Sequence, residues 1–173
     1  ERTLFIQTGC PCPDSGRTPV RIIAAFTSLV LSVTAASAQS PYNENADAKL
    51  EVQRALVEAA ATRTAVLIVF GANWCPDCKL LDAAMKRTPA SELLAREYKI
   101  VKVNVGRFDR NVEMARFYGV PLARGIPAVA IVSPANKTLY ATRAGELADA
   151  RQMGEHGVYE FFKRTVAQAK PKS

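Results

Sequence analysis

The residues with the clearest chemical potential in this sequence are Cys75 and Cys78, which are separated by Pro76 and Asp77. Two thiols at this spacing can close a small disulfide ring, and thiol–disulfide exchange can open it again. The attacking species in that exchange is a thiolate, so the chemistry requires a cysteine whose pKa is lowered. Pro76 stiffens the ring and suits the first position of a helix.

A metal site is the alternative use of such a pair. Structural zinc takes about four ligands. Beyond Cys75 and Cys78 the sequence offers only Cys10 and Cys12, far upstream, and one histidine, His156. We therefore expect no metal, and we interpret His156 as a surface or packing residue.

The segments on either side of the cysteines predict where they lie. The apolar, β-branched run 65–70 predicts a buried central strand. A helix is expected from Pro76 to about Arg87, with an apolar face formed by Leu80, Leu81, Ala84 and Met85. Cys75 would then lie exposed at the helix start, where free backbone N–H groups and the helix dipole stabilise a thiolate. Cys78 would be the shielded partner.

This arrangement resembles the thioredoxin superfamily over about residues 46–169. The segment Trp74-Cys75-Pro76-Asp77-Cys78 is similar to that family's active-site motif, and Arg124-Gly125-Ile126-Pro127 to its cis-proline loop. Lys102 falls in a segment similar to the third strand, whose lysine lies beneath the active site. Gly145 matches the glycine of the substrate-facing loop. The resemblance implies an α/β thioredoxin fold, with a central mixed β-sheet flanked by helices.

The resemblance also implies an activity, that of a protein thiol–disulfide oxidoreductase that needs no cofactor. Cys75 would attack the substrate and Cys78 would resolve the mixed disulfide. Pro127 is expected in a cis peptide bond with Ile126, which would leave the Ile126 backbone free to pair with an extended substrate.

Three side chains near the motif keep two interpretations each. Trp74 either flanks the Cys75 sulfur or packs in the core. Asp77 is either an exposed first-turn acid that favours the helix dipole, or a group whose charge opposes thiolate formation and takes up a proton during exchange. Lys102 favours the thiolate if it is buried below the site, and has no effect if it is exposed.

Two positions depart from the family pattern. The buried acid that thioredoxins carry six residues before the first cysteine is replaced by Val69, which puts the ordinary proton relay in doubt. Ala83 stands where a proline kinks the thioredoxin helix, which affects helix shape and not chemistry.

The other expected elements complete the same fold. A helix capped by Asn45 or Asp47 runs to about residue 62, and Ser91 and Asp109 are expected to cap two shorter helices. With their caps included, the other expected helices span 91–98, 109–118 and 157–169. The expected strands are 99–105, 128–132 and 139–142, and a loop or extra helical turn spans 145–154.

The sequence before this domain has the pattern of a secretory signal. Arg21 precedes the apolar run 22–33, and Ala36-Ser37-Ala38 forms a small-x-small cleavage site, which predicts a signal peptide over 20–38. An uncleaved membrane anchor is the alternative, but the run is short for a span and is interrupted by Ser and Thr.

Three short segments complete the division of the chain. Residues 1–19 are expected to lie outside the native protein, with Val20 as the true start, or to be disordered. Residues 39–45 are expected to form a flexible lead, and residues 170–173 a tail.

Composition narrows the class of protein. A length of 173 residues with 49% hydrophobic residues fits one globular domain, expected to be a monomer. The formal net charge is +7, but the basic residues are scattered and form no cluster with aromatic residues. This favours a solvated basic surface over a nucleic-acid site.

These inferences predict a periplasmic enzyme of a Gram-negative-type cell that acts on protein thiols and disulfides. Because the periplasm is oxidising, a reductant there needs electrons from a membrane-borne donor, and an oxidant needs a matching acceptor. The alternative is a non-catalytic binding module or chaperone that holds extended chains on the Pro127 surface. The intact cysteine pair argues against that alternative.

Overall fold

The computed structural model describes residues 40–169 of the chain. The chain divides into two units, Glu1–Ser37 and Ala38–Ser173, and all of the described residues belong to the second unit. The predicted signal peptide, the residues before it and the C-terminal tail lie outside the described residues. Within residues 40–169, no helix is both long enough and apolar enough to cross a membrane.

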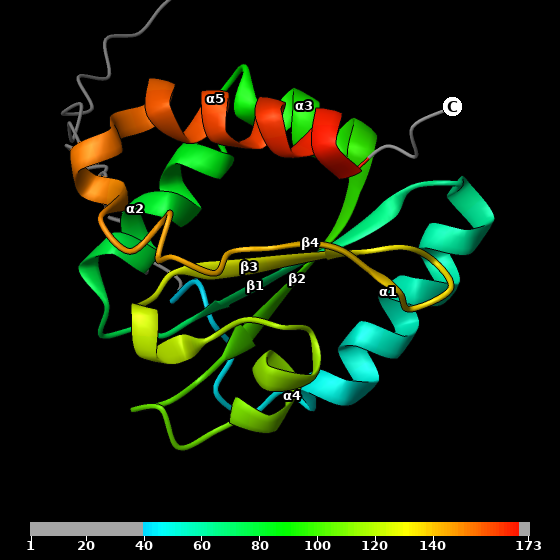
Figure 1. Ribbon diagram of the computed structural model, residues 1–173, viewed down its shortest axis with the longest axis horizontal. Helices are drawn as coiled ribbons and strands as arrows, with labels where there is room; N and C mark the ends of the chain where they lie inside the picture. The colour runs from blue at the N-terminus through cyan, green and yellow to red at the C-terminus, as the bar shows by residue number, and fades with distance from the viewer. Residues whose placement is uncertain (1–39, 170–173) are drawn as a thin grey trace, which may run out of the picture. The chain divides into compact units, whose positions relative to one another are not determined.

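A four-stranded mixed β-sheet forms the centre of the domain (Figure 1). Its strands are β1 (Ala65–Gly71), β2 (Tyr98–Asn104), β3 (Ala128–Val132) and β4 (Thr138–Ala141), in the spatial order β2-β1-β3-β4. β1 pairs in parallel with β2 and antiparallel with β3, and β3 forms a hairpin with β4. β1 is therefore a central strand, and its continuous apolar sequence fits the burial of its side chains on both faces of the sheet.

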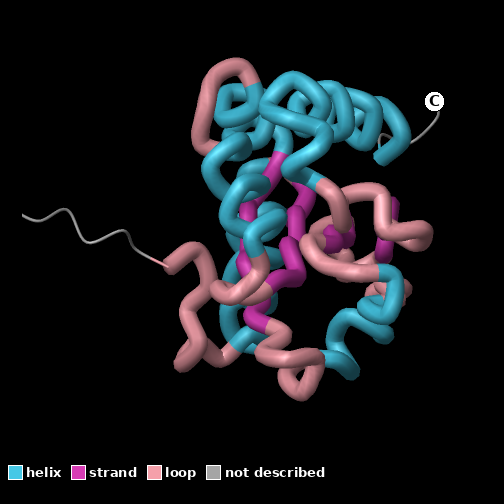
Figure 2. Tube along the Cα trace, turned by 90° about the vertical axis from the view of Figure 1, so that its left-hand side faces the viewer, coloured by secondary structure: helices cyan, strands magenta, loops and turns pink. Residues whose placement is uncertain are grey.

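Helices cover both faces of the sheet. On one face lie α1 (Ala48–Thr62) and α4 (Val112–Phe117), and on the other lie α2 (Pro76–Met85), α3 (Ala90–Glu97) and α5 (Ala150–Ala169). Figure 2 shows the strands from the side, between α5 at the top and α4 below. The predicted fold, a mixed sheet flanked by helices, is confirmed.

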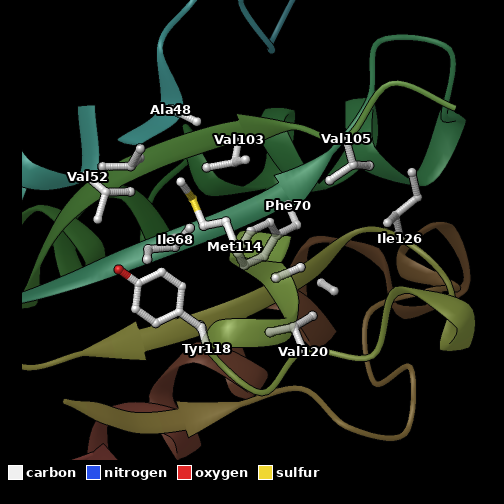
Figure 3. Close-up of a cluster of buried hydrophobic side chains, with 14 of the residues drawn as sticks. Ala48, Val52, Ile68, Phe70, Val103, Val105, Met114, Tyr118, Val120 and Ile126 are labelled. Carbon is white, nitrogen blue, oxygen red and sulfur yellow. The ribbon is translucent and has the colours of Figure 1, made fainter. Parts of the chain in front are cut away.

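Alternating side chains of β1 supply two separate apolar clusters, as the period of a strand requires. Ile68 and Phe70 belong to the cluster beneath α1 and α4, where Figure 3 shows them together with Met114. Leu67 and Val69 belong to the cluster beneath α2 and α5.

Of the three predicted helix caps, the structure confirms the one before α1 and not those before α3 and α4. Asp47 caps α1, accepting a hydrogen bond from the Leu50 N–H at 3.1 Å. The expected caps Ser91 and Asp109 are wrong, because α3 already begins at Ala90 and α4 begins only after Asn111. The carboxylate of Asp109 instead accepts from the Arg107 N–H at 2.8 Å, a partner within its own loop.

The last helix begins earlier than expected. α5 starts at Ala150 and continues through a kink at Gly154, whose φ of 64° and ψ of −178° are not helical. The extra turn and the final helix of the sequence prediction are thus one element with a break between them.

One residue of the segment expected to be a flexible lead, Tyr42, is packed in the interior, while residues 43–45 are exposed. Tyr42 is only 2% exposed and belongs to the core cluster beneath α1. The prediction rested on the polarity of the segment, and it missed that this aromatic ring reaches the interior.

Candidate active site

The two cysteines lie where β1 gives way to α2. Cys75 is the N-cap of α2, and its sulfur accepts a hydrogen bond from the Cys78 N–H at 3.2 Å. Pro76 is the first residue of the helix, the position that suits it because its missing N–H has no intrahelical partner there. Both cysteines are thiols in this structure. The predicted strand–turn–helix setting is confirmed.

The surroundings shift the pKa values of the two thiols in opposite directions. A hydrogen bond from the Cys78 side chain lowers the pKa of Cys75 from 9.0 to about 7, against the effect of burial, and backbone N–H groups of Cys78 and Asp77 assist. The same bond to Cys75, together with burial, raises the pKa of Cys78. The pair is therefore divided into a ready nucleophile and a partner that holds its proton.

Cys75 is less accessible than its position at a helix start suggested. It is only 4% exposed, and its sulfur donates a hydrogen bond to the Ile126 carbonyl oxygen at 3.5 Å. The expectation of an exposed sulfur is wrong because the loop before β3 packs over it.

The predicted cis peptide bond between Ile126 and Pro127 is present. The Ile126 carbonyl is not free while Cys75 is protonated, because it accepts the thiol proton. A thiolate has no proton to donate, so ionisation of Cys75 releases this carbonyl for another donor.

The acidity of Cys75 leads to a testable pH dependence. We expect its alkylation by iodoacetamide to rise with pH and to be half-maximal near pH 7, because the reactive thiolate forms with a pKa of about 7. Asp77→Asn should move the midpoint to lower pH, since the Asp77 charge raises the pKa of Cys75. Mass spectrometry of quenched samples gives the rates. A wild-type midpoint at the ordinary thiol value of 9.0 would contradict the assignment.

Trp74, the first residue of the motif, lies at the surface, so its core-packing interpretation is wrong. Its side chain is 47% exposed, and its indole Nε1 donates to the Gly106 carbonyl at 2.8 Å. Its ring meets that of Phe108 edge to face, with centroids 6.0 Å apart. Phe108 is itself 45% exposed and was missed, although an aromatic residue in the polar loop 106–111 was a visible signal.

Asp77 is buried, so its interpretation as an exposed acid is wrong. One carboxylate oxygen accepts from the Arg151 backbone N–H at 3.0 Å, and both lie 3.2 Å from Arg151 Nε. Arg151 stands in the first turn of α5, so Asp77 ties the start of α2 to the start of α5. Its charge also opposes ionisation of Cys75, as the tuning interpretation expected.

Lys102 falls between the two cases considered for it. Its side chain is 26% exposed, and its ammonium forms an ion pair with Asp82, which also binds Lys86 at 2.8 Å. Burial opposes ionisation of Asp82, but hydrogen bonds from Lys102 and Lys86 lower the pKa of its carboxyl group.

Asp82 therefore provides an acid for this lysine from α2, whereas thioredoxins have one on the strand. The strand position is occupied by Val69, which is 1% exposed and lies opposite Lys102 in the register of β1 and β2. Sequence reasoning missed Asp82, although it lies one helical turn after Cys78.

Gly145 packs against the cis-proline loop at Arg124. Its φ is +82°, and a Cβ there would lie 2.5 Å from the Arg124 carbonyl oxygen. Only glycine permits both the backbone conformation and this close approach. His156 is exposed on α5. Across residues 40–169, no group of three or more His, Cys, Asp or Glu side chains is placed to hold a metal ion.

Comparison with known proteins identifies the family. A sequence model of thioredoxin-like proteins matches residues 47–134, half of the chain. The chain belongs to the thioredoxin-like family. A thioredoxin of Buchnera aphidicola subsp. Baizongia pistaciae (strain Bp) is 34% identical to it over 90 residues, which are 50% of this chain and 70% of that protein. The resemblance drawn from the sequence motifs is confirmed.

Solved structures agree with this assignment. The crystal structure of a disulphide isomerase from Xylella fastidiosa Temecula1 is 44% identical, with a TM-score of 0.71 over 73% of this chain and 96% of that one. The C-terminal domain of Neisseria meningitidis DsbD in the oxidised form, at 16% identity, shares the fold, with a TM-score of 0.50 over 69% of this chain and 97% of that one. The thioredoxin-like relatives support thiol–disulfide oxidoreductase chemistry in general terms.

Proposed function

We propose that this thioredoxin-like protein exchanges disulfides with protein substrates in the periplasm, with Cys75 as nucleophile and Cys78 as resolving thiol. The observation that carries the proposal is the placement of the pair: Cys75 is the N-cap of α2, its sulfur accepts a hydrogen bond from the Cys78 N–H at 3.2 Å, and Cys78 is 0% exposed. In this setting the pKa of Cys75 is lowered to about 7 and the pKa of Cys78 is raised. A nucleophile that ionises near neutral pH, next to a thiol that stays protonated, is what stepwise exchange requires.

The reaction proceeds in two displacements. The Cys75 thiolate attacks one sulfur of the substrate disulfide, and the other substrate sulfur leaves as a thiolate. Cys78 then loses its proton and attacks the Cys75 sulfur, which forms the Cys75–Cys78 disulfide and releases the second substrate thiolate. Read backwards, the same two steps oxidise a substrate dithiol, so the residues serve either direction.

The substrate is proposed to dock as an extended chain over the Ile126–Pro127 loop. Ionisation of Cys75 frees the Ile126 carbonyl to accept a substrate N–H, since the thiol no longer donates to it. The exposed rings of Trp74 and Phe108 add an apolar surface next to the motif.

The periplasmic location rests on the signal-peptide pattern over residues 20–38, and the need for a membrane-borne redox partner follows from that location. An oxidising compartment supplies no electrons to a reductant, so we propose a membrane-borne donor, or an acceptor if the protein is an oxidant. The reduction potential of the Cys75–Cys78 couple separates these cases, roughly −270 mV for a reductant and roughly −120 mV for an oxidant.

Insulin reduction in the presence of dithiothreitol tests the proposal against the binding-module alternative. We expect the wild-type protein to accelerate cleavage of the insulin disulfides and Cys75→Ala/Cys78→Ala to lose this activity entirely. A parallel assay follows suppression of aggregation of an unfolded protein. If the double variant suppresses aggregation as well as wild type, and wild type reduces no insulin, the protein is a binding module.

A further inference from the structure

Tyr42 reaches the active site from a segment that lies outside the motif. It precedes α1, yet Asn73, two residues before Cys75, holds its backbone on both sides. The Tyr42 N–H donates to Asn73 Oδ1 at 3.0 Å, and Asn73 Nδ2 donates to the Tyr42 carbonyl at 2.8 Å. This paired contact fixes the start of the Tyr42 side chain next to the turn that carries the cysteines.

Gly71, the last residue of β1, leaves the space that the Tyr42 ring occupies. A Cβ at Gly71 would lie 2.9 Å from Cys78 Sγ and closer still to the Tyr42 hydroxyl oxygen. The phenol oxygen and the buried sulfur therefore border the same point, side by side in the core. Any larger residue at position 71 would displace one of them.

We propose that Tyr42 is a catalytic residue of the resolving step, its hydroxyl donating a hydrogen bond to Cys78 Sγ and stabilising the thiolate that forms there. This inference rests on the proposed function and names a residue for its second displacement.

The thiolate at Cys78 needs such a donor because its surroundings disfavour charge. Cys78 is 0% exposed, so a charge on its sulfur is shielded from water. The bond to Cys75 and burial raise the pKa of Cys78, while a backbone hydrogen bond of Ala72 and then the Tyr42 hydroxyl, the one side-chain donor, lower it. The pKa of Tyr42 is itself raised, mainly by burial and to a smaller extent by the negative charges of Cys78, Cys75 and Asp82. The phenol therefore keeps its proton and remains a hydrogen-bond donor.

The resolving step transfers one proton to water, forms one sulfur–sulfur bond and breaks another. Cys78 gives its proton to water, and its thiolate uses an electron pair to form a bond with Cys75 Sγ. At the same time the bond between Cys75 Sγ and the substrate sulfur breaks. The released substrate thiolate then takes a proton from water. Tyr42 keeps its proton throughout. In the reverse direction Cys78 is the leaving group and receives the same hydrogen bond, so the role does not depend on direction.

A single turnover with 5,5′-dithiobis(2-nitrobenzoate) separates the two steps by stopped flow. The first equivalent of thionitrobenzoate leaves when Cys75 attacks, and the second leaves when Cys78 attacks the resulting mixed disulfide. In Tyr42→Phe we expect the second phase to slow about tenfold at neutral pH, the usual effect of a hydrogen bond to a charged group. Its pH profile should move to higher pH, while the first phase changes less than about twofold.

Tyr118→Phe is the matched control, since it removes another buried phenol hydroxyl, one that bonds Asn136 Oδ1 at 2.9 Å in the turn after β3. It should leave both phases unchanged, and thermal unfolding should show both variants folded. An unaltered second phase in Tyr42→Phe, equal slowing of its two phases, or equal slowing in Tyr118→Phe overturns the inference alone. A wild-type protein that releases no first equivalent contradicts the proposed function and the inference together.

Discussion

Cys78→Ser should trap substrate proteins on Cys75 through disulfides that dithiothreitol releases, and Cys75→Ser should trap few or none. The first variant keeps the nucleophile and lacks the resolving thiol, so exchange stops at the mixed disulfide. The second lacks the nucleophile, and we expect its rate of insulin reduction to fall at least about a thousandfold. Periplasmic expression, non-reducing electrophoresis and mass spectrometry of the trapped species measure the outcome.

The residue that replaces Cys78 should affect the pKa of Cys75 and therefore the rate of trapping. The Cys78 side chain is the largest influence lowering the pKa of Cys75, and a hydroxyl there can still donate a hydrogen bond. Cys78→Ala removes that donor, so it should trap more slowly at neutral pH than Cys78→Ser does. If Cys75→Ser traps partners as well as Cys78→Ser does, the assigned roles are wrong. If neither variant traps any protein, the binding-module alternative gains support.

Val69→Asp should lower the free energy of unfolding by roughly 3–5 kcal/mol, the usual cost of a buried charge without a partner. Val69 is 1% exposed in the apolar cluster beneath α2 and α5. Its register neighbour Lys102 is the natural counter-ion, but it is already paired with Asp82. A carboxylate introduced here therefore has to compete for that cation or remain unpaired. Urea unfolding of the reduced protein measures the loss.

A double-mutant cycle tests whether Val69→Asp is costly because Lys102 is already paired with Asp82. Asp82→Asn frees Lys102, so Val69→Asp should cost less in that background than in wild type, and the two effects should not add. Val69→Thr is the uncharged control of similar shape and should cost much less than Val69→Asp. Full additivity would show that Lys102 does not reach position 69. A loss below about 1 kcal/mol would show that the site admits water or another partner.

The features that the sequence determined are local. The apolar run of β1, the two-residue spacing of the cysteines and Pro76 at the helix start each act over a few residues, and together they place Cys75 at the N-terminus of α2. The same holds for Pro127, whose cis bond was inferred from the Gly-Ile-Pro context and the family resemblance. Hydrophobic periodicity located the individual strands and helices, whereas the mixed sheet with its helical layers was implied by the resemblance to the thioredoxin superfamily.

Tertiary packing decided the environment of the two sulfurs. The loop at Ile126 buries Cys75, Arg151 draws Asp77 inward, Asp82 takes the charge of Lys102, and Tyr42 arrives beside Cys78. The first three of these contacts join residues between 20 and 74 positions apart in the chain. No local pattern encodes such pairings, because they depend on how β1, β2, α2 and α5 are placed against one another. The opposite pKa shifts of the two cysteines arise first from the hydrogen bond between their own side chains, which is a local contact, and tertiary packing adds the burial that raises both pKa values.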